Sequence, residues 1–335
     1  MRELMIASIL LVWAAAALAE PSESLLSQLR DSMVKVHVDT RGGGRGLGSG
    51  VVVSENMVAT NCHVLANTGG VGISKRGVYY IPVALKADWK HDICLLRFEN
   101  LPLKPVALGD STRLRYEQPV FSIGYQLAAQ RPLATYGKIK ALYPLDGNPV
   151  IRASSSFRLG ASGSAMLDED GALIGINTFM SPGPRSYFYS MPVAWIKALL
   201  VSGDETTSLA QKQQPFWNAS EDQQPYFMRV VIPALSEHWQ SLGQIAEQWC
   251  NAEPDNAEAW YYLGLAEERQ GNDSAANTYL QKALALNPQH ADALFEIGMI
   301  ASRQGNEAEV QRVGLILNGL DADAAEALRK AAFNN

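Results

Sequence analysis

The chain has 335 residues and a formal net charge of -6 at pH 7. This length allows two domains, and the absence of a Lys/Arg cluster argues against nucleic acid or an anionic membrane surface as a partner. Three cysteines are too few to form the disulfide framework of a small secreted scaffold in a chain of this size. We therefore expect ordinary hydrophobic cores to stabilise the protein.

The first residues predict export. Arg2 gives a short positive start, residues 4–16 form an almost unbroken apolar run, and residues 17–19 (Ala-Leu-Ala) offer the small-x-small pattern that signal peptidase cuts. The run is short for a membrane span and ends in small residues, so we expect residues 1–19 to be a cleaved signal peptide. A retained membrane anchor is the alternative. No later segment is long enough to cross a bilayer, so the mature chain should have no membrane span.

Residues 20–201 are predicted to form an all-β domain that ends in a helical stretch at 193–200. Short apolar or alternating runs are separated by turn residues, which is typical of a barrel or a sandwich. The runs cover residues 34–38, 50–53, 57–60, 93–98, 120–123, 150–153, 173–176 and 187–191.

Residues 202–235 are predicted to be a linker, because residues 202–224 are polar and aperiodic. Residues 236–335 then show a helical period with an internal repeat of 34 residues, in which Leu294 and Gly298 continue the pattern of Trp260 and Gly264. This spacing resembles tetratricopeptide (TPR) repeats, and residues 321–333 would act as a capping helix. An accidental amphipathic hairpin is the alternative. Such arrays bind peptides or proteins on a concave face, so a protein partner is expected here.

Gly160-Ala161-Ser162-Gly163 is the sharpest chemical motif. Acyl transfer needs a nucleophilic hydroxyl on a tight turn, with backbone N–H groups directed at the developing oxyanion. Ser162 is the candidate nucleophile, and the amides of Gly160 and Ser162 are the candidate oxyanion hole. Without a partner base, the same letters would describe an ordinary turn.

The general base that would activate Ser162 must be one of the five histidines of the chain. His37 lies inside a strand-like run, His238 and His290 lie beyond the linker, and His91 is adjacent to a better acid candidate. His63, which directly follows a buried-type strand, is therefore the candidate base.

The third member of a catalytic triad must orient the imidazole ring of the base. Asp92 lies at the mouth of a buried-type strand, where a carboxylate is costly unless it is paired. Asp88 does not adjoin the apolar run, and Asp110 fits a turn. Cys62 and Cys94 flank these candidates and could pair only if their strands are adjacent, which the sequence leaves open. Cys250 lies in a helical context and is expected to be free and buried.

The order His63, Asp92, Ser162 with its flanking residues resembles the trypsin-like serine peptidases, and specifically the HtrA/Deg family. The likeness covers residues 25–200. Five stretches carry it, at residues 48–64, 92–96, 105–111, 121–125 and 173–178, together with the nucleophile motif.

The resemblance implies two packed antiparallel barrels with the site between them, no metal or cofactor, and cleavage of unfolded or exposed segments of envelope proteins in the periplasm. It also implies that Ile176, Asn177 and Thr178 lie along the substrate. In trypsin-like folds the residue six before the nucleophile lies at the base of the primary specificity pocket, which here is Ser156.

The sequence departs from the family at Ala161, Ser164 and Ala165, where asparagine, glycine and proline are usual. The TPR-like region replaces the usual PDZ domain. A second hypothesis is therefore a degenerate protease that serves as a scaffold, with the helical repeats as its interaction module. The physiological substrate, the oligomeric state and the activating signal are not encoded in any recognisable motif.

Overall fold

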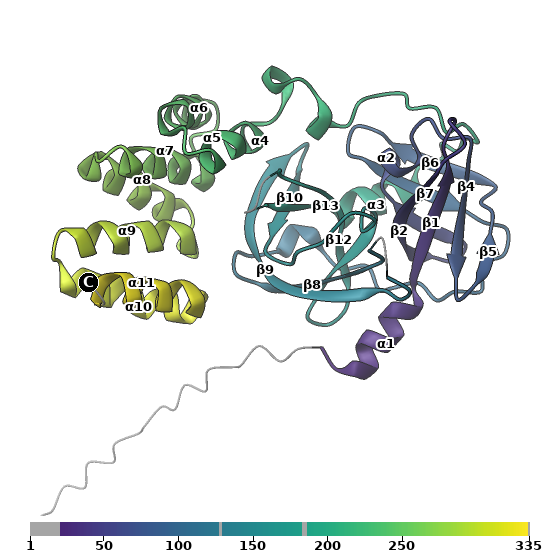
Figure 1. Cartoon of the computed structure of the whole chain (residues 1–335), viewed down its shortest axis with the longest axis horizontal. Helices are drawn as coiled ribbons and strands as arrows, with labels where there is room; N and C mark the ends of the chain where they lie inside the picture. The colour runs from purple at the N-terminus through teal and green to yellow at the C-terminus, as the bar shows by residue number, and fades with distance from the viewer. Residues whose placement is uncertain (1–20, 127–128, 183–185, 334–335) are drawn as a thin grey trace, which may run out of the picture.

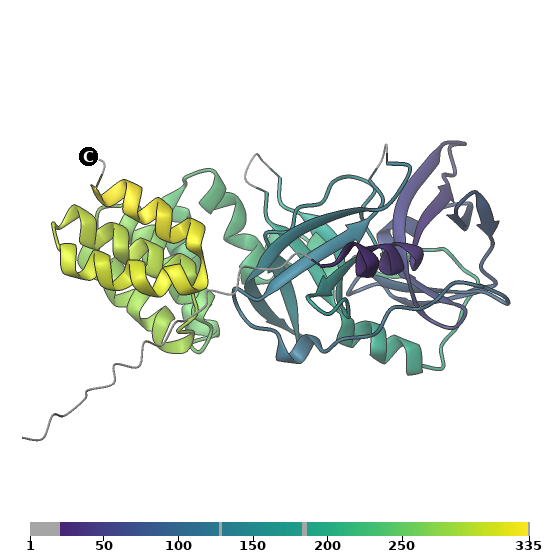
Figure 2. The same cartoon turned by 90° about the horizontal axis from the view of Figure 1, so that it is seen from below.

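The computed structural model describes residues 21–126, 129–182 and 186–333. The predicted signal peptide, residues 1–19, lies outside the described residues. Two β-lobes lie side by side, and the helical region packs beside the second of them, on the side away from the first (Figure 1, Figure 2). The predicted class, an all-β double barrel followed by an all-α solenoid, is confirmed.

The first lobe is a seven-stranded antiparallel sheet with the order β5-β4-β1-β2-β3-β7-β6. Strands β2 and β3 are joined by a tight turn at Asn56. Helix α2, which contains His63, follows β3. A short helix α1 (Glu23–Asp31) precedes the sheet. The elements are β1 (Met33–Asp39), β2 (Arg45–Ser54), β3 (Met57–Thr60), α2 (Cys62–Leu65), β4 (Gly70–Lys75), β5 (Val78–Tyr80), β6 (Ala84–Asp88) and β7 (Ile93–Arg97).

The second lobe is a closed antiparallel barrel with the order β10-β13-β12-β11-β8-β9. The helix α3 (Val193–Val201) follows it, close to the helical stretch expected from the sequence. Strands β4, β6 and β9 were not expected from the sequence. The elements are η1 (Ser111–Arg113), β8 (Pro119–Gly124), β9 (Leu133–Leu145), β10 (Asn148–Ala153), β11 (Ser164–Asp168), β12 (Leu173–Met180) and β13 (Phe188–Pro192).

The segment after α3, residues 202–235, is called the connector below. It first lies against the first lobe. Thr206 forms an antiparallel bridge with Leu85, and Leu209 packs against the core of the first lobe. Further along, the Phe216 amide donates to the Lys90 carbonyl at 3.0 Å. The short helices of this connector are η2 (Phe216–Asn218), η3 (Glu221–Gln223), α4 (Tyr226–Arg229) and α5 (Val231–Leu235).

The helical repeat has a physical basis in two glycines. A Cβ on Gly264 would lie 2.7 Å from Leu280 of α8, and one on Gly298 would lie 2.6 Å from Leu328 of α11, so the same repeat position allows a close helix contact in both units. Gly271 and Gly305 end the first helix of each hairpin with a positive φ. The helices are α6 (Trp239–Ala252), α7 (Ala257–Arg269), α8 (Asp273–Leu286), α9 (Ala291–Arg303), α10 (Glu307–Leu320) and α11 (Ala322–Phe333).

Candidate active site

The three candidate triad residues come from both lobes. His63 lies in α2, directly after β3, and Asp92 lies directly before β7, which pairs with β3. Ser162 lies in the loop between β10 and β11 of the second barrel. Adjacent strands of the first lobe therefore bring the acid and the histidine together, and the packing of the lobes brings the serine loop to them.

His63 and Asp92 form a closely held pair. His63 Nδ1 lies 2.6 Å from Asp92 Oδ2, and the His63 backbone N–H donates to Oδ1 at 2.7 Å. Asp92 is completely buried and adopts a positive φ of 60°. Asn61 Nδ2 donates to the Asp92 carbonyl at 2.9 Å, which fixes this uncommon backbone conformation. The carboxylate thus holds both the backbone and the ring of His63.

A disulfide joins α2, which carries His63, to β7, which directly follows Asp92. Cys62 and Cys94 are bonded, with their Cα atoms 4.9 Å apart, and Cys94 is the cross-strand partner of Thr60 on β3. The question that the sequence left open is therefore answered by strand adjacency. Cys250 is free and buried, as expected, and burial raises the pKa of its thiol to about 12.

The Ser162 loop is tied to the first lobe by Ser49 on β2. The Ser49 amide donates to the Ser162 carbonyl at 2.8 Å, and Ser49 Oγ lies 2.9 Å from the Gly160 carbonyl. Gly163 has a φ of +87°, and a Cβ there would lie 2.1 Å from the Ser49 carbonyl oxygen. Only glycine fits this close approach of the lobes.

The Ser162 hydroxyl faces the second barrel in this structure. Its Oγ lies 3.5 Å from the Thr178 carbonyl, and within the described part of the chain no hydrogen bond joins it to His63. Catalytic hydrogen bonds between a nucleophile and its base are often long before substrate binds. The His63 side chain remains 29% exposed, which leaves the ring accessible.

The two amides of the candidate oxyanion hole are available. Gly160 has a φ of +90°, and among the described residues neither its N–H nor that of Ser162 donates a hydrogen bond. The intervening Ala161 amide closes a turn onto the Arg158 carbonyl at 2.9 Å. Paired free N–H groups beside a serine are what an oxyanion would require.

The candidate substrate-binding residues differ in their surroundings. Ser156 is exposed, and Thr135 Oγ1 donates to its carbonyl at 2.7 Å. Ile176, Asn177 and Thr178 are buried, and the Asn177 amide is used inside the barrel, where it donates to Ser164 Oγ at 2.8 Å. These three residues of β12 could therefore offer a substrate only their backbone.

The remaining candidates from the sequence have other partners. His91 Nδ1 lies 2.6 Å from Asp88, and its Nε2 lies 2.9 Å from Asp146, which also pairs with Lys90. Its ring stacks on Trp195 at 3.9 Å. Burial, the largest single effect, lowers the pKa of His91, but the hydrogen bonds and charges of the two aspartates outweigh it and raise the pKa above its ordinary value.

One residue near the pair was missed by sequence reasoning. Trp217, from the predicted linker, donates its indole N–H to Asp92 Oδ2 at 3.1 Å. The adjacent aromatic pair Phe216–Trp217 within a polar stretch was the available signal. Across the described ranges of the chain, no group of three or more His, Cys, Asp or Glu side chains could hold a metal ion.

Comparison with known proteins places these features. Residues 48–176 match the family model of the trypsin-like peptidase domain, and residues 257–290 match that of the tetratricopeptide repeat. The chain contains a trypsin-like peptidase domain similar to those of the HtrA/Deg proteases. The resemblance inferred from the sequence is therefore confirmed.

Two relatives illustrate the extent of the likeness. The periplasmic pH-dependent serine endoprotease DegQ of Escherichia coli is 34% identical over 151 residues, which are 42% of this chain and 33% of DegQ. Serine protease HTRA1B of Danio rerio is 34% identical over 142 residues, which are 39% of this chain and 30% of that protein. The chain thus matches these curated relatives over only about a third of their length.

Two solved structures are similar to this chain over a little more than half of its length. The HtrA-type protease AlgW with tripeptide is 25% identical, with a TM-score of 0.49, over 54% of this chain and 62% of that one. The active form of the Rv3671c protease from M. tuberculosis is 19% identical, with a TM-score of 0.49, over 57% of this chain and 92% of that one.

Across the residues that the structure describes, no helix is both long and apolar enough for a membrane span.

Proposed function

We propose that this chain is a serine endopeptidase with Ser162 as nucleophile, His63 as general base and Asp92 as the group that orients His63. The observation that carries the proposal is the paired His63–Asp92 contact, 2.6 Å long, on a domain that matches the trypsin-like peptidases. The serine loop that Ser49 holds beside it supplies the nucleophile.

The proposed reaction uses only side chains and backbone amides. His63 Nε2 accepts the Ser162 hydroxyl proton as Oγ attacks a peptide carbonyl carbon, and the carbonyl oxygen gains negative charge. The amides of Gly160 and Ser162 stabilise this oxyanion. His63 then donates the proton to the leaving amine, and the peptide C–N bond breaks. Water, deprotonated by His63, hydrolyses the acyl-enzyme and releases Ser162.

The proposed substrates are unfolded or exposed segments of envelope proteins, in the periplasm. The similarity to DegQ and to a DegP-like protein of Chlamydia pneumoniae, both named as periplasmic serine endoproteases, supports this compartment. No Asp or Glu lies between residues 150 and 167, so this stretch offers no carboxylate to pair with a substrate Lys or Arg near Ser156. An aliphatic side chain gains about 0.8 kcal/mol per buried methylene instead.

We therefore expect cleavage after Val, Ala, Ile or Leu. Mass spectrometry of the products of denatured casein tests this, and products that end mainly in Lys or Arg would show that an acid elsewhere reaches the pocket.

The triad itself is tested by labelling with a fluorophosphonate probe and by hydrolysis of denatured casein. Ser162→Ala should abolish labelling, and Ser162→Ala and His63→Ala should each lose nearly all hydrolysis without adding to one another, because the residues act as a unit. Asp92→Asn should cause a severe loss of hydrolysis that is less complete than that of the other two variants. Ser154→Ala, an exposed serine close to the same loop, is the matched control and should behave as the wild type. Substantial hydrolysis by Ser162→Ala would refute the mechanism and leave the scaffold hypothesis.

A further inference from the structure

Trp217 reaches the candidate triad from the segment that connects the two parts of the chain. It lies in η2, far along the sequence from Asp92, and its Nε1 donates to Asp92 Oδ2 at 3.1 Å. Its ring meets the His63 ring edge-on, with centroids 5.4 Å apart and an interplanar angle of 86°. The other side of the indole stacks on Phe179 of β12, also at 5.4 Å.

The position of Trp217 is fixed on both sides. The preceding residue, Phe216, is buried, its amide bonds to the first lobe through Lys90, and its ring lies 6.2 Å from Phe227 of α4. On the following side, Gln224 Nε2 donates to the carbonyls of Trp217 (3.3 Å) and Ala219 (2.9 Å). The indole is therefore held by the barrels and by the fold of the connector.

The buried carboxylate of Asp92 needs these donors. Two side-chain N–H groups, from His63 and Trp217, meet at Oδ2, while Oδ1 accepts the His63 backbone N–H. A carboxylate with no exposure to water is stable as an anion only when its oxygens are hydrogen-bonded. The nearby hydroxyl of Thr178 does not serve Asp92, because it donates to the Ile176 carbonyl and accepts from Asn61 Nδ2.

We propose that Trp217 is a positioning residue of the active site: its indole N–H fixes the Asp92 carboxylate, and through it the ring of His63. This inference rests on the proposed peptidase function. It makes the connector part of the catalytic apparatus, because a donor that orients the triad acid comes from outside the segment, residues 48–176, that matches the peptidase family. The competing view is that Trp217 only fills space beside His63 and Phe179.

Trp217→Phe separates these views, because it keeps an aromatic ring and removes the donor. Trp260→Phe is the matched control: its indole N–H also makes one hydrogen bond, to the Pro254 carbonyl at 2.8 Å, but within the helical repeats. A hydrogen bond to a charged group that orients a catalytic histidine predicts a loss in kcat of about tenfold for Trp217→Phe. KM for fluorescent casein should change less than about twofold, and Trp260→Phe should match the wild type in both.

A second readout follows the hydrogen bond itself. The downfield proton NMR resonance of the His63–Asp92 pair should shift in Trp217→Phe and stay in place in Trp260→Phe, since only the former changes the charge density on Oδ2. An unchanged resonance with kcat within twofold of the wild type would overturn the inference. Wild-type protein that neither hydrolyses casein nor reacts with the fluorophosphonate would instead refute the proposed function, while the resonance would still decide the role of Trp217.

A third variant covers the case in which Trp217→Phe does not fold cooperatively. Gln224→Ala keeps the indole and removes the side chain that bonds to the Trp217 carbonyl. It should shift the same resonance in the same direction and lower kcat by a smaller factor. A Gln224→Ala protein with the wild-type resonance and wild-type kcat would count against the proposal.

Discussion

Phe227 of α4 packs the connector onto the second barrel. Its ring is 2% exposed and stacks on Tyr143 of β9, with centroids 4.4 Å apart and planes 11° from parallel. Tyr189 of β13 and Phe216 lie 6.0 and 6.2 Å away. A single cluster of buried residues continues from the barrel through this contact into the helices. Phe227→Ala therefore tests whether the two parts share one core.

We expect Phe227→Ala to lower the free energy of unfolding by about 4 kcal/mol. Truncation of a buried phenylalanine costs about 3–5 kcal/mol, and an aromatic stack adds about 0.5–1.5 kcal/mol beyond the area buried. The rings of Tyr143 and Tyr189 are fully buried and tightly packed, so they have little room to fill the cavity. Ile232→Ala on the adjacent α5, at a side chain that is 49% exposed, should cost less than about 1 kcal/mol.

Urea unfolding of the mature chain, followed by tryptophan fluorescence and circular dichroism, measures both variants. One shared core predicts coincident transitions in the two signals. A loss below about 1 kcal/mol for Phe227→Ala would refute the reasoning. So would two separate transitions with the barrel transition unmoved, because the helices would then be an independent unit.

Two further predictions concern the first lobe. Replacing Cys62 and Cys94 with serine opens a loop with a sequence separation of 32, and chain entropy predicts a loss of about 3–4 kcal/mol in urea unfolding, whereas equal stability would mean that the strands alone hold the pair. The raised pKa of His91 beside Asp88 and Asp146 means that its stabilisation is complete below the unfolded-state pKa and is lost as the pH rises through the folded-state pKa. The stability gap between wild type and His91→Gln should therefore be widest near about pH 5.5 and narrow towards about pH 8.5, and a gap that widens with pH would contradict this.

The pairing of His63 with Asp92 could be predicted from the sequence because it depends on local features of two strands. His63 follows one buried-type strand and Asp92 precedes another, which restricts where their side chains can lie. The pairing of β3 with β7 then places His63 beside Asp92. The helical repeat was also readable, since Gly264 and Gly298 are each needed for close helix contact at the same position of the period. Both inferences depend on residues near one another in sequence or in a repeat.

The contacts of the connector could not be read in this way. Its composition is polar, but Thr206 pairs with Leu85, Phe216 bonds to Lys90, and Trp217 bonds to Asp92. Each partner lies more than a hundred residues earlier, and no periodicity relates the two members of a pair. The disulfide and the aspartate pair around His91 are similar, because they require the register of strands and loops and not merely their existence.

The polar contacts between the helices and the second barrel bear on what the repeats can bind. Glu258 and His290, from the first helix of one repeat and the start of the next, are both buried, with His290 Nε2 3.2 Å from Glu258. Tyr116 of the barrel lobe donates to Glu258 at 2.9 Å. Burial alone would raise the pKa of Glu258, but His290, Arg152 and Tyr116 outweigh it and hold the pKa below its usual value.

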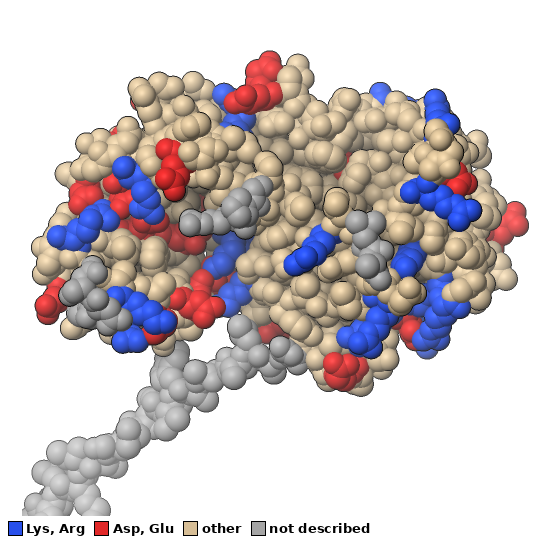
Figure 3. All heavy atoms as spheres, in the orientation of Figure 1, with Lys and Arg blue, Asp and Glu red and all other residues tan. Residues whose placement is uncertain are grey.

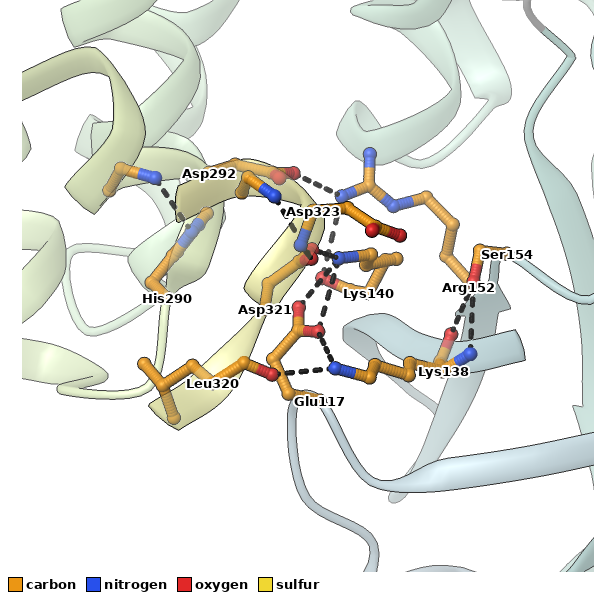
Figure 4. A network of polar contacts seen from close by, with 12 residues as sticks. Glu117, Lys138, Lys140, Arg152, Ser154, His290, Asp292, Leu320, Asp321 and Asp323 are labelled. Carbon is orange, nitrogen blue, oxygen red and sulfur yellow. Dashed lines mark hydrogen bonds and ion pairs between the residues drawn. The ribbon is translucent and has the colours of Figure 1, made fainter. Parts of the chain in front are cut away.

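A second set of charges lies between His290 and the barrel (Figure 4). Arg152 of β10 lies 3.2 Å from Asp292 of α9, and Lys140 of β9 bonds to Glu117 at 2.9 Å and to Asp321 at 2.5 Å. Side chains of both signs gather where the helices adjoin the barrel (Figure 3). Buried ion pairs add little net stability compared with apolar packing, but removal of one member leaves an uncompensated charge, so they favour a single docking geometry.

These contacts come from the first turns of α7 and α9 and from Asp321, between α10 and α11. Helices α7 and α9 are buried over most of their residues, whereas α8 and α10 bury one stripe each. A partner of the helical region would have to bind the exposed sides of α8 and α10, or displace the barrel and leave Arg152 without Asp292 and Glu258 without Tyr116. The second route costs buried charge pairs as well as apolar area, so the exposed sides are where we expect any partner to bind.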